Sequence, residues 1–304
     1  HSAERYANAC IRYLNRHKDS EKPFFAYVAF QTPHDPLDVP EEYLARYDGI
    51  EIPLWEPFLP EHPFDNGMLK ILDEKLESFP RTREKILERL KAYYAVMTHT
   101  DAQIGRIFKT LDEQGMTENT IIVFASDYGL ALGSHGLLGK QNVYEHSVKV
   151  PFIVAGPGLP KGEDRQQFTY IYDIYPTLCE LVGIETPDTV QDRSLKPVLE
   201  DADAEHRKHL YFAFMEWQRA VRDQRYKLIE YCVKGERTTQ LFDLQEDPAE
   251  TENLADKKAH QATLSRLRKL LQAERVRLND GSTPYEFSNA QGIKFWTTYD
   301  GAGP

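Results

Sequence analysis

The sequence predicts an α/β protein: a mostly parallel sheet flanked by helices, followed by a small antiparallel sheet and one helix. Short apolar runs alternate with amphipathic helical segments in the first part, as expected for strands buried on both faces of a parallel sheet. Beyond about residue 205, strand-like runs follow one another without intervening helices, which favours antiparallel pairing. We therefore expect two parts, residues 1–205 and 206–304.

The elements of the first part follow from hydrophobic spacing and breakers. Apolar residues recur at helical spacing in three segments, 3–17, 81–114 and 171–183. Continuous apolar runs predict three buried strands, 23–30, 120–126 and 150–156. Prolines and glycines predict irregular backbone over residues 31–40, 48–66 and 127–141.

The second part is predicted from the same signals. Four short runs read as strands of one antiparallel sheet, at 209–214, 219–223, 225–233 and 238–244. An amphipathic helix follows over about 256–279, and the tail from residue 281 has a loop-like composition with aromatic anchors.

Composition and charge exclude several classes of protein. The net charge is −11 and the pI is near 5.4, which argues against a general nucleic-acid binder. No apolar run is long enough for a transmembrane helix. The three cysteines have neither the number nor the spacing of a disulfide framework or a metal site. The chain begins at His1 with an amphipathic segment rather than a secretory signal, so its compartment cannot be read from its start.

The polar residues that follow the predicted strands are the candidates for a site. Ligands bind beyond the carboxyl ends of strands in an open α/β sheet. His34 follows the first strand and could donate a proton, and Asp127 follows the second and could hold a hard cation. Lys140, in the glycine-rich loop, could hold an anionic oxygen.

Each candidate also has a structural interpretation. An aspartate at a strand end is often a turn cap, and a histidine between prolines is usually a loop residue. Lys140 taken alone fits a solvated surface charge, and His135 fits a residue that fixes a turn. The functional interpretation gains weight because the candidates converge on one edge of the predicted sheet.

The residues in their order resemble a known family. The segments PFFAYVAFQTPHDPLDVPEEY, TIIVFASDYG, LGSHGLLGKQNVYEHSVKVPFIVAGPG, YDIYPTLCELVGI and QLFDLQEDPAETENLA are similar to those of the formylglycine-dependent sulfatases, within the alkaline phosphatase superfamily. The resemblance implies a doubly wound α/β domain with a mixed, mostly parallel sheet, plus a small C-terminal antiparallel sheet and helix. It implies hydrolysis of a sulfate ester, with a formylglycine nucleophile and a calcium ion.

The resemblance also implies roles for individual residues. His34 matches the family's histidine near the leaving-group oxygen, and Lys140 matches the lysine that contacts the sulfate. Asp127 matches a metal-binding aspartate, and Tyr128 stands at the next metal position, where the family usually has His or Asn. These roles agree with the chemistry, because charge that develops on sulfate oxygens is stabilised by a cation, a lysine and an acid.

Two departures from the family pattern bear on activity. The nucleophile motif, Cys or Ser followed by x-Pro-Ser-Arg, is absent, and so are the paired N-terminal metal aspartates. We therefore expect the family's N-terminal segment to lie outside this chain and to be its partner, and we expect this chain alone to be inactive. Tyr128 is a poorer calcium ligand than an amide oxygen.

The leading hypothesis is an arylsulfatase-like hydrolase acting on a small-molecule or carbohydrate sulfate ester. The alternatives are a phosphodiesterase or phosphonate monoester hydrolase of the same superfamily, and a non-catalytic relative that binds anions. Trp55, Trp296 and His135 are candidates for substrate binding, although the aromatic residues equally fit loop packing. A homo-oligomer is possible, and a signal peptide in a preceding segment would place the protein in the periplasm or outside the cell.

Overall fold

The computed structural model describes residues 1–280 together with Trp296 and Tyr299. It divides into two compact units. Unit 1 comprises residues 1–54, 82–124 and 153–159, and unit 2 comprises residues 55–81, 125–152 and the chain from residue 160 onward. The predicted division of the sequence at residue 205 stays a prediction.

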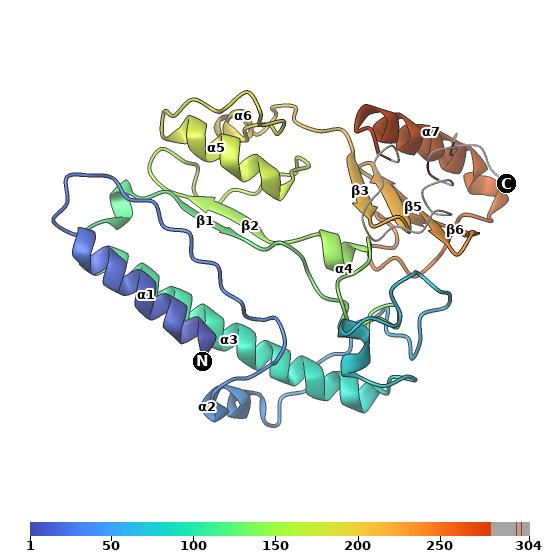
Figure 1. The fold of residues 1–304 in the computed structure, drawn as a ribbon, viewed down its shortest axis with the longest axis horizontal. Coiled ribbons are helices and arrows are strands. Elements are labelled where there is room, and N and C mark those ends of the chain that lie inside the picture. Colours follow the sequence, from blue (N-terminus) through green and yellow to red (C-terminus); the bar gives the residue numbers. More distant parts are fainter. Residues whose placement is uncertain (281–295, 297–298, 300–304) are drawn as a thin grey trace. The chain divides into compact units, whose positions relative to one another are not determined.

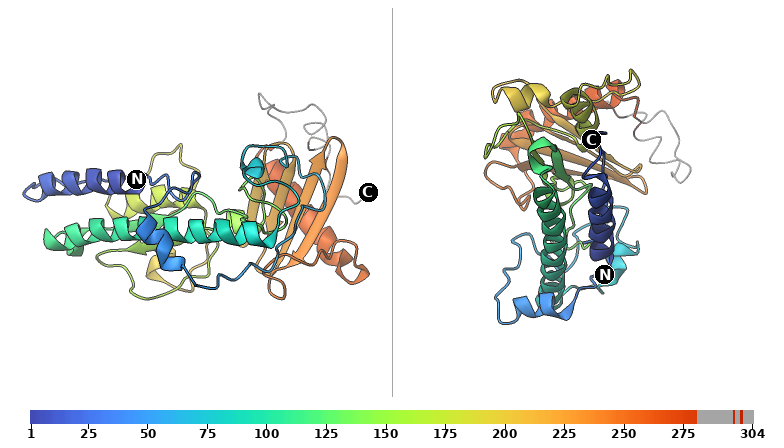
Figure 2. Two further views of the ribbon diagram at one scale, coloured as in Figure 1. Left: turned by 90° about the horizontal axis from the view of Figure 1, so that it is seen from below. Right: turned by 90° about the vertical axis from the view of Figure 1, so that its left-hand side faces the viewer.

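Unit 1 is built on two long helices, as predicted. Helix α1 (Ser2–His17) lies along helix α3 (Arg83–Glu113), and two views show them side by side (Figures 1 and 2). The residues that join them are apolar and recur every three or four positions: Ala7, Cys10, Leu14, Ile107 and Leu111. Thr82 caps α3 by accepting a hydrogen bond from the Lys85 backbone, which commonly contributes about 1 kcal/mol.

The strands of unit 1 are fewer than predicted. Strands β1 (Ile122–Ala125) and β2 (Phe152–Ala155) form a two-stranded sheet. Residues 23–30 form no strand, and Phe25 and Tyr27 are 75% and 84% exposed. The prediction of a strand buried on both faces is therefore wrong for this segment. The reason is that among the described residues no strand pairs with it, and only alternate side chains such as Phe24 and Val28 pack on the core of α1 and α3.

Unit 2 contains the predicted antiparallel sheet. Its four strands pair in chain order: β3 (Leu210–Phe214), β4 (Gln218–Arg222), β5 (Tyr226–Val233) and β6 (Glu236–Asp243). Helix α7 (Gln261–Arg277) covers one face (Figure 1), through the predicted apolar stripe that includes Leu264, Leu267 and Leu271. Within the described residues this sheet and the β1–β2 pair are the only sheets, so the expected large parallel sheet is not seen.

The opposite face of the same sheet supports the glycine-rich loop. Because side chains alternate along a strand, Val221 faces α7 whereas Ala220 and Ile229 face away from it. Onto this second face pack Leu137 and Tyr144, both about 1% exposed. The sheet therefore holds the loop that carries the candidate lysine.

Short helices complete the described chain. The remaining α-helices are α2 (Glu41–Leu44), α4 (Glu145–Val148), α5 (Ile174–Leu181) and α6 (Lys196–Glu200). The 3₁₀ helices are η1 (Ala45–Tyr47), η2 (Asp73–Leu76), η3 (Thr117–Asn119), η4 (Ile171–Asp173) and η5 (Lys258–His260). Of the helices in the described part, none has both the length and the hydropathy needed to cross a bilayer. The three cysteines are free and buried.

Candidate functional site

Asp127 and Tyr128 lie on a tightly packed turn of unit 2. Asp127 is exposed, and the Ser126 hydroxyl donates a hydrogen bond to the Tyr128 carbonyl at 2.9 Å. The turn is held to helix α4, because Gly129 N–H donates to the Ser147 carbonyl at 3.0 Å. A Cβ on Gly129 would lie 2.0 Å from the backbone oxygen of His146, so only glycine permits this approach.

Lys140 joins this turn through the ring of Tyr128. Its ammonium lies 4.8 Å from the Tyr128 ring centroid and 3.0 Å from a carboxylate oxygen of Asp73. Burial alone would lower the pKa of Lys140, but the hydrogen bond and charge of Asp73, together with Tyr128, outweigh it and raise the pKa. Lys140 is therefore a fully charged group, half-buried and held in place.

The loop that presents Lys140 is buried along its length, from Ala131 to Gly139. It closes on itself, with Gly133 N–H donating to the Leu137 carbonyl at 2.8 Å. Gly136 adopts φ +72°, and a Cβ there would lie 2.2 Å from the Glu61 carbonyl carbon. The glycines predicted irregular backbone, and the structure gives the reason: the loop packs against other backbone where a side chain would not fit.

Two acidic residues of η2 hold this loop, and the sequence analysis missed both. Glu74, 3% exposed, accepts hydrogen bonds from the backbone N–H groups of Leu138 and Gly139 at 3.0 and 2.9 Å. Asp73 binds the Lys140 ammonium. Neither residue stands in a recognisable motif, and both lie beyond the irregular segment predicted over residues 48–66.

His34 lies in unit 1, on a turn anchored to helix α3. The Thr32 hydroxyl lies 2.7 Å from that of Thr100, and Asp35 forms an ion pair with Arg89. Between these anchors His34 is exposed, and its Nδ1 lies 2.9 Å from the Asp35 carbonyl oxygen. Its predicted role near a leaving group stays a prediction, because His34 belongs to a different unit from Lys140.

The described residues do not by themselves fit a calcium ion. Calcium takes six to eight oxygen ligands, commonly from several carboxylates. Within the part of the chain that the structure describes, no group of three or more His, Cys, Asp or Glu side chains could hold a metal. Asp127 is a single carboxylate, and the ring of Tyr128 faces Lys140.

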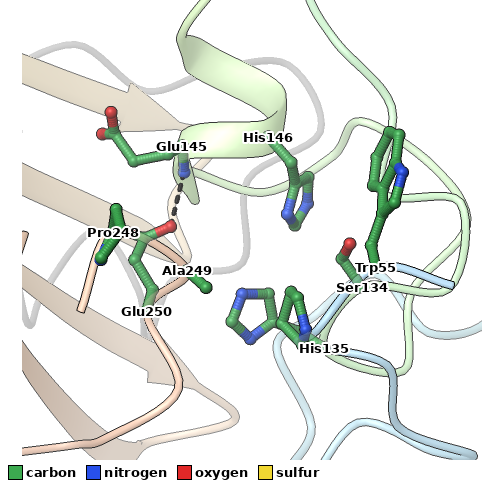
Figure 3. A pocket seen from close by; sticks show the side chains of 9 residues that line it. Trp55, Ser134, His135, Glu145, His146, Pro248, Ala249 and Glu250 are labelled. Carbon is green, nitrogen blue, oxygen red and sulfur yellow. Dashed lines mark hydrogen bonds between the residues drawn. The ribbon is translucent and has the colours of Figure 1, made fainter. Parts of the chain in front are cut away.

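Two predicted substrate-binding residues line one cavity of unit 2. Trp55 and His135 border a space of about 170 Å³, together with Ser134, His146 and Glu250 (Figure 3). The His135 ring stacks on Tyr144, with centroids 4.0 Å apart. Burial lowers the pKa of His135 to about 3 and that of His146 well below its usual value. The histidines that line this cavity are therefore neutral at pH 7.

Trp296 packs as a core residue. It is 1% exposed, and its indole N–H donates to the Glu216 carbonyl at 2.5 Å. The guanidinium groups of Arg219 and Arg275 lie 4.9 and 5.2 Å from its ring. The ring contacts two guanidinium groups and its N–H is hydrogen-bonded within unit 2. Trp296 therefore exposes almost no surface on which a substrate could stack. Apart from Trp296 and Tyr299, the tail from residue 281 that was predicted to be loop-like lies outside the described residues.

Two family models match the sequence of this chain. The family model described as "Sulfatase" matches residues 1–184, and that described as "N-sulphoglucosamine sulphohydrolase, C-terminal" matches residues 133–277. The chain belongs to the sulfatase family.

Curated relatives of this sulfatase-family chain are longer than it is. An arylsulfatase of Clostridium perfringens is 33% identical over 300 residues, which cover 93% of this chain and 60% of the relative. A choline-sulfatase of Rhizobium meliloti is 30% identical over 284 residues, 86% of this chain and 53% of the relative. The chain thus spans between about half and three fifths of these relatives.

Solved structures share the fold of this sulfatase-family chain. A phosphonate monoester hydrolase of Agrobacterium radiobacter has a TM-score of 0.75 at 27% identity, over 89% of this chain and 60% of that one. A protein solved in complex with its substrate D-glucosamine-2-N,6-O-disulfate has a TM-score of 0.79 at 22% identity, over 95% of this chain and 72% of that one. At 22% identity the second likeness concerns the fold alone.

Proposed function

We propose that the protein to which this chain belongs hydrolyses a sulfate ester, with Lys140 binding the anionic group. The observation that supports this most directly is the half-buried ammonium of Lys140, which is held beside the Asp127–Tyr128 turn within unit 2. A fixed cation beside the oxygens of a sulfate group stabilises the bound anion, and it also stabilises the negative charge that develops in the transition state. Family membership makes sulfate the first candidate for that anion.

The remaining catalytic groups of the proposal come from the family resemblance. Asp127 would contribute one oxygen to a calcium ion, and His34 would donate a proton to the leaving group. The family's formylglycine nucleophile has no counterpart in this sequence. We therefore expect the 304-residue chain alone not to hydrolyse sulfate esters. Measurable, metal-dependent turnover of an aryl sulfate by this chain would refute the assignment.

The comparisons suggest two substrate classes for this proposal. Small aryl or alkyl sulfates are suggested by the names of the curated relatives, arylsulfatase and choline-sulfatase. A sulfated sugar is suggested by the description of the second family model, "N-sulphoglucosamine sulphohydrolase, C-terminal", which matches residues 133–277. Which of these the full-length protein accepts is best measured by parallel turnover of an aryl sulfate, choline sulfate and a sulfated glucosamine.

Phosphonate monoester hydrolysis is the second candidate. It is favoured by structural relatives of that activity, which are 26% and 27% identical to this chain. The decisive experiment compares kcat/KM of the full-length gene product on an aryl sulfate and on an aryl phosphonate ester. We expect the sulfate to be preferred, and we expect Lys140→Ala to raise KM and lower kcat. A strong preference for the phosphonate would establish the second candidate instead.

A further inference from the structure

The 3₁₀ helix η2 holds the Lys140 loop through a buried carboxylate. Besides accepting two backbone N–H groups of the loop, Glu74 forms a 2.6 Å ion pair with Arg81, which is itself 2% exposed. Arg81 also donates to the carbonyl groups of Glu74 and Gly136. A buried charge is tolerated only when it is paired and hydrogen-bonded, and the carboxylate of Glu74 is compensated by Arg81 together with the loop backbone.

The loop fits closely against this helix at Gly139. A Cβ on Gly139 would lie 2.4 Å from Oε1 of Gln141 and 2.9 Å from the Cβ of Asp73. The residue before Lys140 is therefore in direct contact with η2. Small changes in the position of η2 would move the backbone that carries the lysine.

Asp73, the first residue of η2, acts on the side chain of Lys140. One of its carboxylate oxygens lies 3.0 Å from the Lys140 ammonium and also accepts a 2.8 Å hydrogen bond from the Gln141 side chain. Gln141 in turn accepts a hydrogen bond from the Lys140 backbone N–H at 3.0 Å. Asp73, Lys140 and Gln141 thus contact one another pairwise. The Tyr128 ring adds a further contact to the Lys140 ammonium.

These contacts suit a lysine that must be fixed before its ligand arrives. A lysine side chain has four flexible bonds and loses substantial rotamer entropy when an anion immobilises it. A carboxylate that already orients the ammonium reduces that loss on binding. Lys140 and Asp73 are only 17% and 22% exposed, so their interaction is less screened than that of a surface pair.

We propose that Asp73 is a positioning residue for Lys140, and that Glu74 fixes the backbone of the same loop. The inference rests on the proposed function, since it takes Lys140 to bind the anionic group. Asp73 does not touch the substrate. It acts by holding the ammonium in the orientation that an anionic ester or inorganic sulfate requires.

A double-mutant cycle in the full-length protein tests this proposal. Inorganic sulfate is titrated by calorimetry, and kcat and KM are measured for an aryl sulfate, with Asp73→Ala and Lys140→Ala made singly and together. We expect Asp73→Ala to weaken sulfate binding roughly tenfold, because the Lys140 side chain must then lose its rotamer freedom when sulfate binds. In the Lys140→Ala background the same change should have no further effect, because the two residues act as one unit.

Asp65→Ala is the matched control. Asp65 lies in the same segment of unit 2 and also pairs with a lysine, Lys234, at 2.7 Å, but this pair is exposed. Its loss removes the same charge and should leave sulfate binding unchanged. Asp73→Asn, which keeps an oxygen acceptor, should recover part of the affinity lost in Asp73→Ala.

The possible results separate the two levels of inference. If Asp73→Ala weakens binding equally in both backgrounds, or leaves it unchanged while Lys140→Ala abolishes it, the positioning role is wrong and the proposed function stands. If Lys140→Ala itself leaves sulfate binding and kinetics unchanged, both fail. The role of Glu74 in fixing the loop backbone is tested separately, by amide hydrogen exchange. Exchange at Leu138 and Gly139 should accelerate in Glu74→Ala, and unchanged exchange would contradict that role.

Discussion

At the residue scale, the candidates differ in how firmly the structure holds them. Lys140 is fixed by an ion pair and an aromatic ring, whereas Asp127 is exposed and His34 lies exposed between two anchored neighbours. A residue that must deliver a proton needs access to its substrate, and a residue that binds a charge benefits from being fixed beforehand. The local environments therefore agree with the roles proposed for Lys140 and His34.

Replacing His34 should affect catalysis in a way that depends on the leaving group. In the full-length protein we expect His34→Ala to lower kcat by about 10²–10⁴-fold for poor leaving groups, and much less for good ones, because only a poor leaving group needs a proton. The change should leave stability within roughly 1 kcal/mol, since the side chain is exposed. A series of aryl sulfates of different leaving-group acidity measures this. Equal losses across the series would remove His34 from the proposed mechanism.

Replacing Tyr128 should alter calcium binding. A phenol is a poor calcium ligand compared with an amide oxygen, and the ring faces the Lys140 ammonium. We therefore expect Tyr128→Asn to raise the calcium affinity of the full-length protein, as measured by calorimetry on both versions. Identical affinities would mean that position 128 does not contribute to the ion's ligands.

At the element scale, the structure explains why a loop can carry a defined site. The segment from Ala131 to Tyr144 packs on one face of the β3–β6 sheet, and its backbone donates hydrogen bonds to η2. Helix α4 is tied to the same sheet, because Lys227 contacts Glu145 at 3.0 Å and Glu250 at 2.9 Å. Removing the buried Lys227 would be costly in stability, because the charges of Glu145 and Glu250 would be left uncompensated.

Two glycine substitutions should shift stability in opposite directions. Gly105 lies inside α3 with nothing within 4 Å of the position that a Cβ would take, so Gly105→Ala should stabilise by about 0.5–1 kcal/mol through helix propensity. Gly136 has φ +72° and backbone atoms 2.2 Å from the corresponding position, so Gly136→Ala should destabilise by more than about 2 kcal/mol. Urea unfolding of both variants measures this. A stable Gly136→Ala protein would mean that the loop adopts another conformation.

At the scale of the whole molecule, buried histidines set the response to acid. Burial lowers the pKa of His62 to about 4 and that of His135 to about 3, and it also lowers the pKa of His146. A histidine in the unfolded chain titrates near pH 6.5. Below that pH the unfolded state therefore binds protons that the buried rings of the folded state do not bind. The stability contributed by the neutral rings is therefore present above about pH 6.5 and is lost as the pH falls toward 4.

The expected loss is up to about 1.4 kcal/mol per pH unit for each histidine that remains neutral. Urea unfolding between about pH 7 and pH 4.5 measures the slope. His62→Gln keeps a donor for the 2.8 Å contact with the His135 carbonyl but removes one titrating group, so its slope should be shallower. A stability that does not change over this range would show that the three rings are already accessible to protons.

Exposed apolar side chains of unit 1 should make this chain self-associate. Phe25, Tyr27 and Ile153 are 75%, 84% and 59% exposed, and exposed apolar surface favours association. We expect concentration-dependent association in sedimentation experiments, reduced by the double change Phe25→Ser and Tyr27→Ser. Val276→Ser, which removes a 70% exposed valine from α7, is the control and should have no effect. A monodisperse monomer at all concentrations would contradict this prediction.

The sequence by itself determined the elements whose signals are local. The periodicity of α1, α3 and α7, the succession of strands β3 to β6 and the glycine-rich loop around Lys140 were all predicted, because each depends on residues close together in the chain. Residues 23–30 were misassigned, because an apolar run tells nothing about whether a neighbouring strand is present to pair with it.

Only the tertiary structure decided what surrounds the candidate residues. The contacts of Lys140 with Asp73 and of Gly139 with Glu74 join positions more than sixty residues apart, and no local pattern encodes them. The same is true of Trp296, whose aromatic side chain fits a ligand contact or a core contact equally well until its neighbours are known. Local signals fix which backbone forms, whereas burial and charge pairing between distant segments fix what each side chain can do.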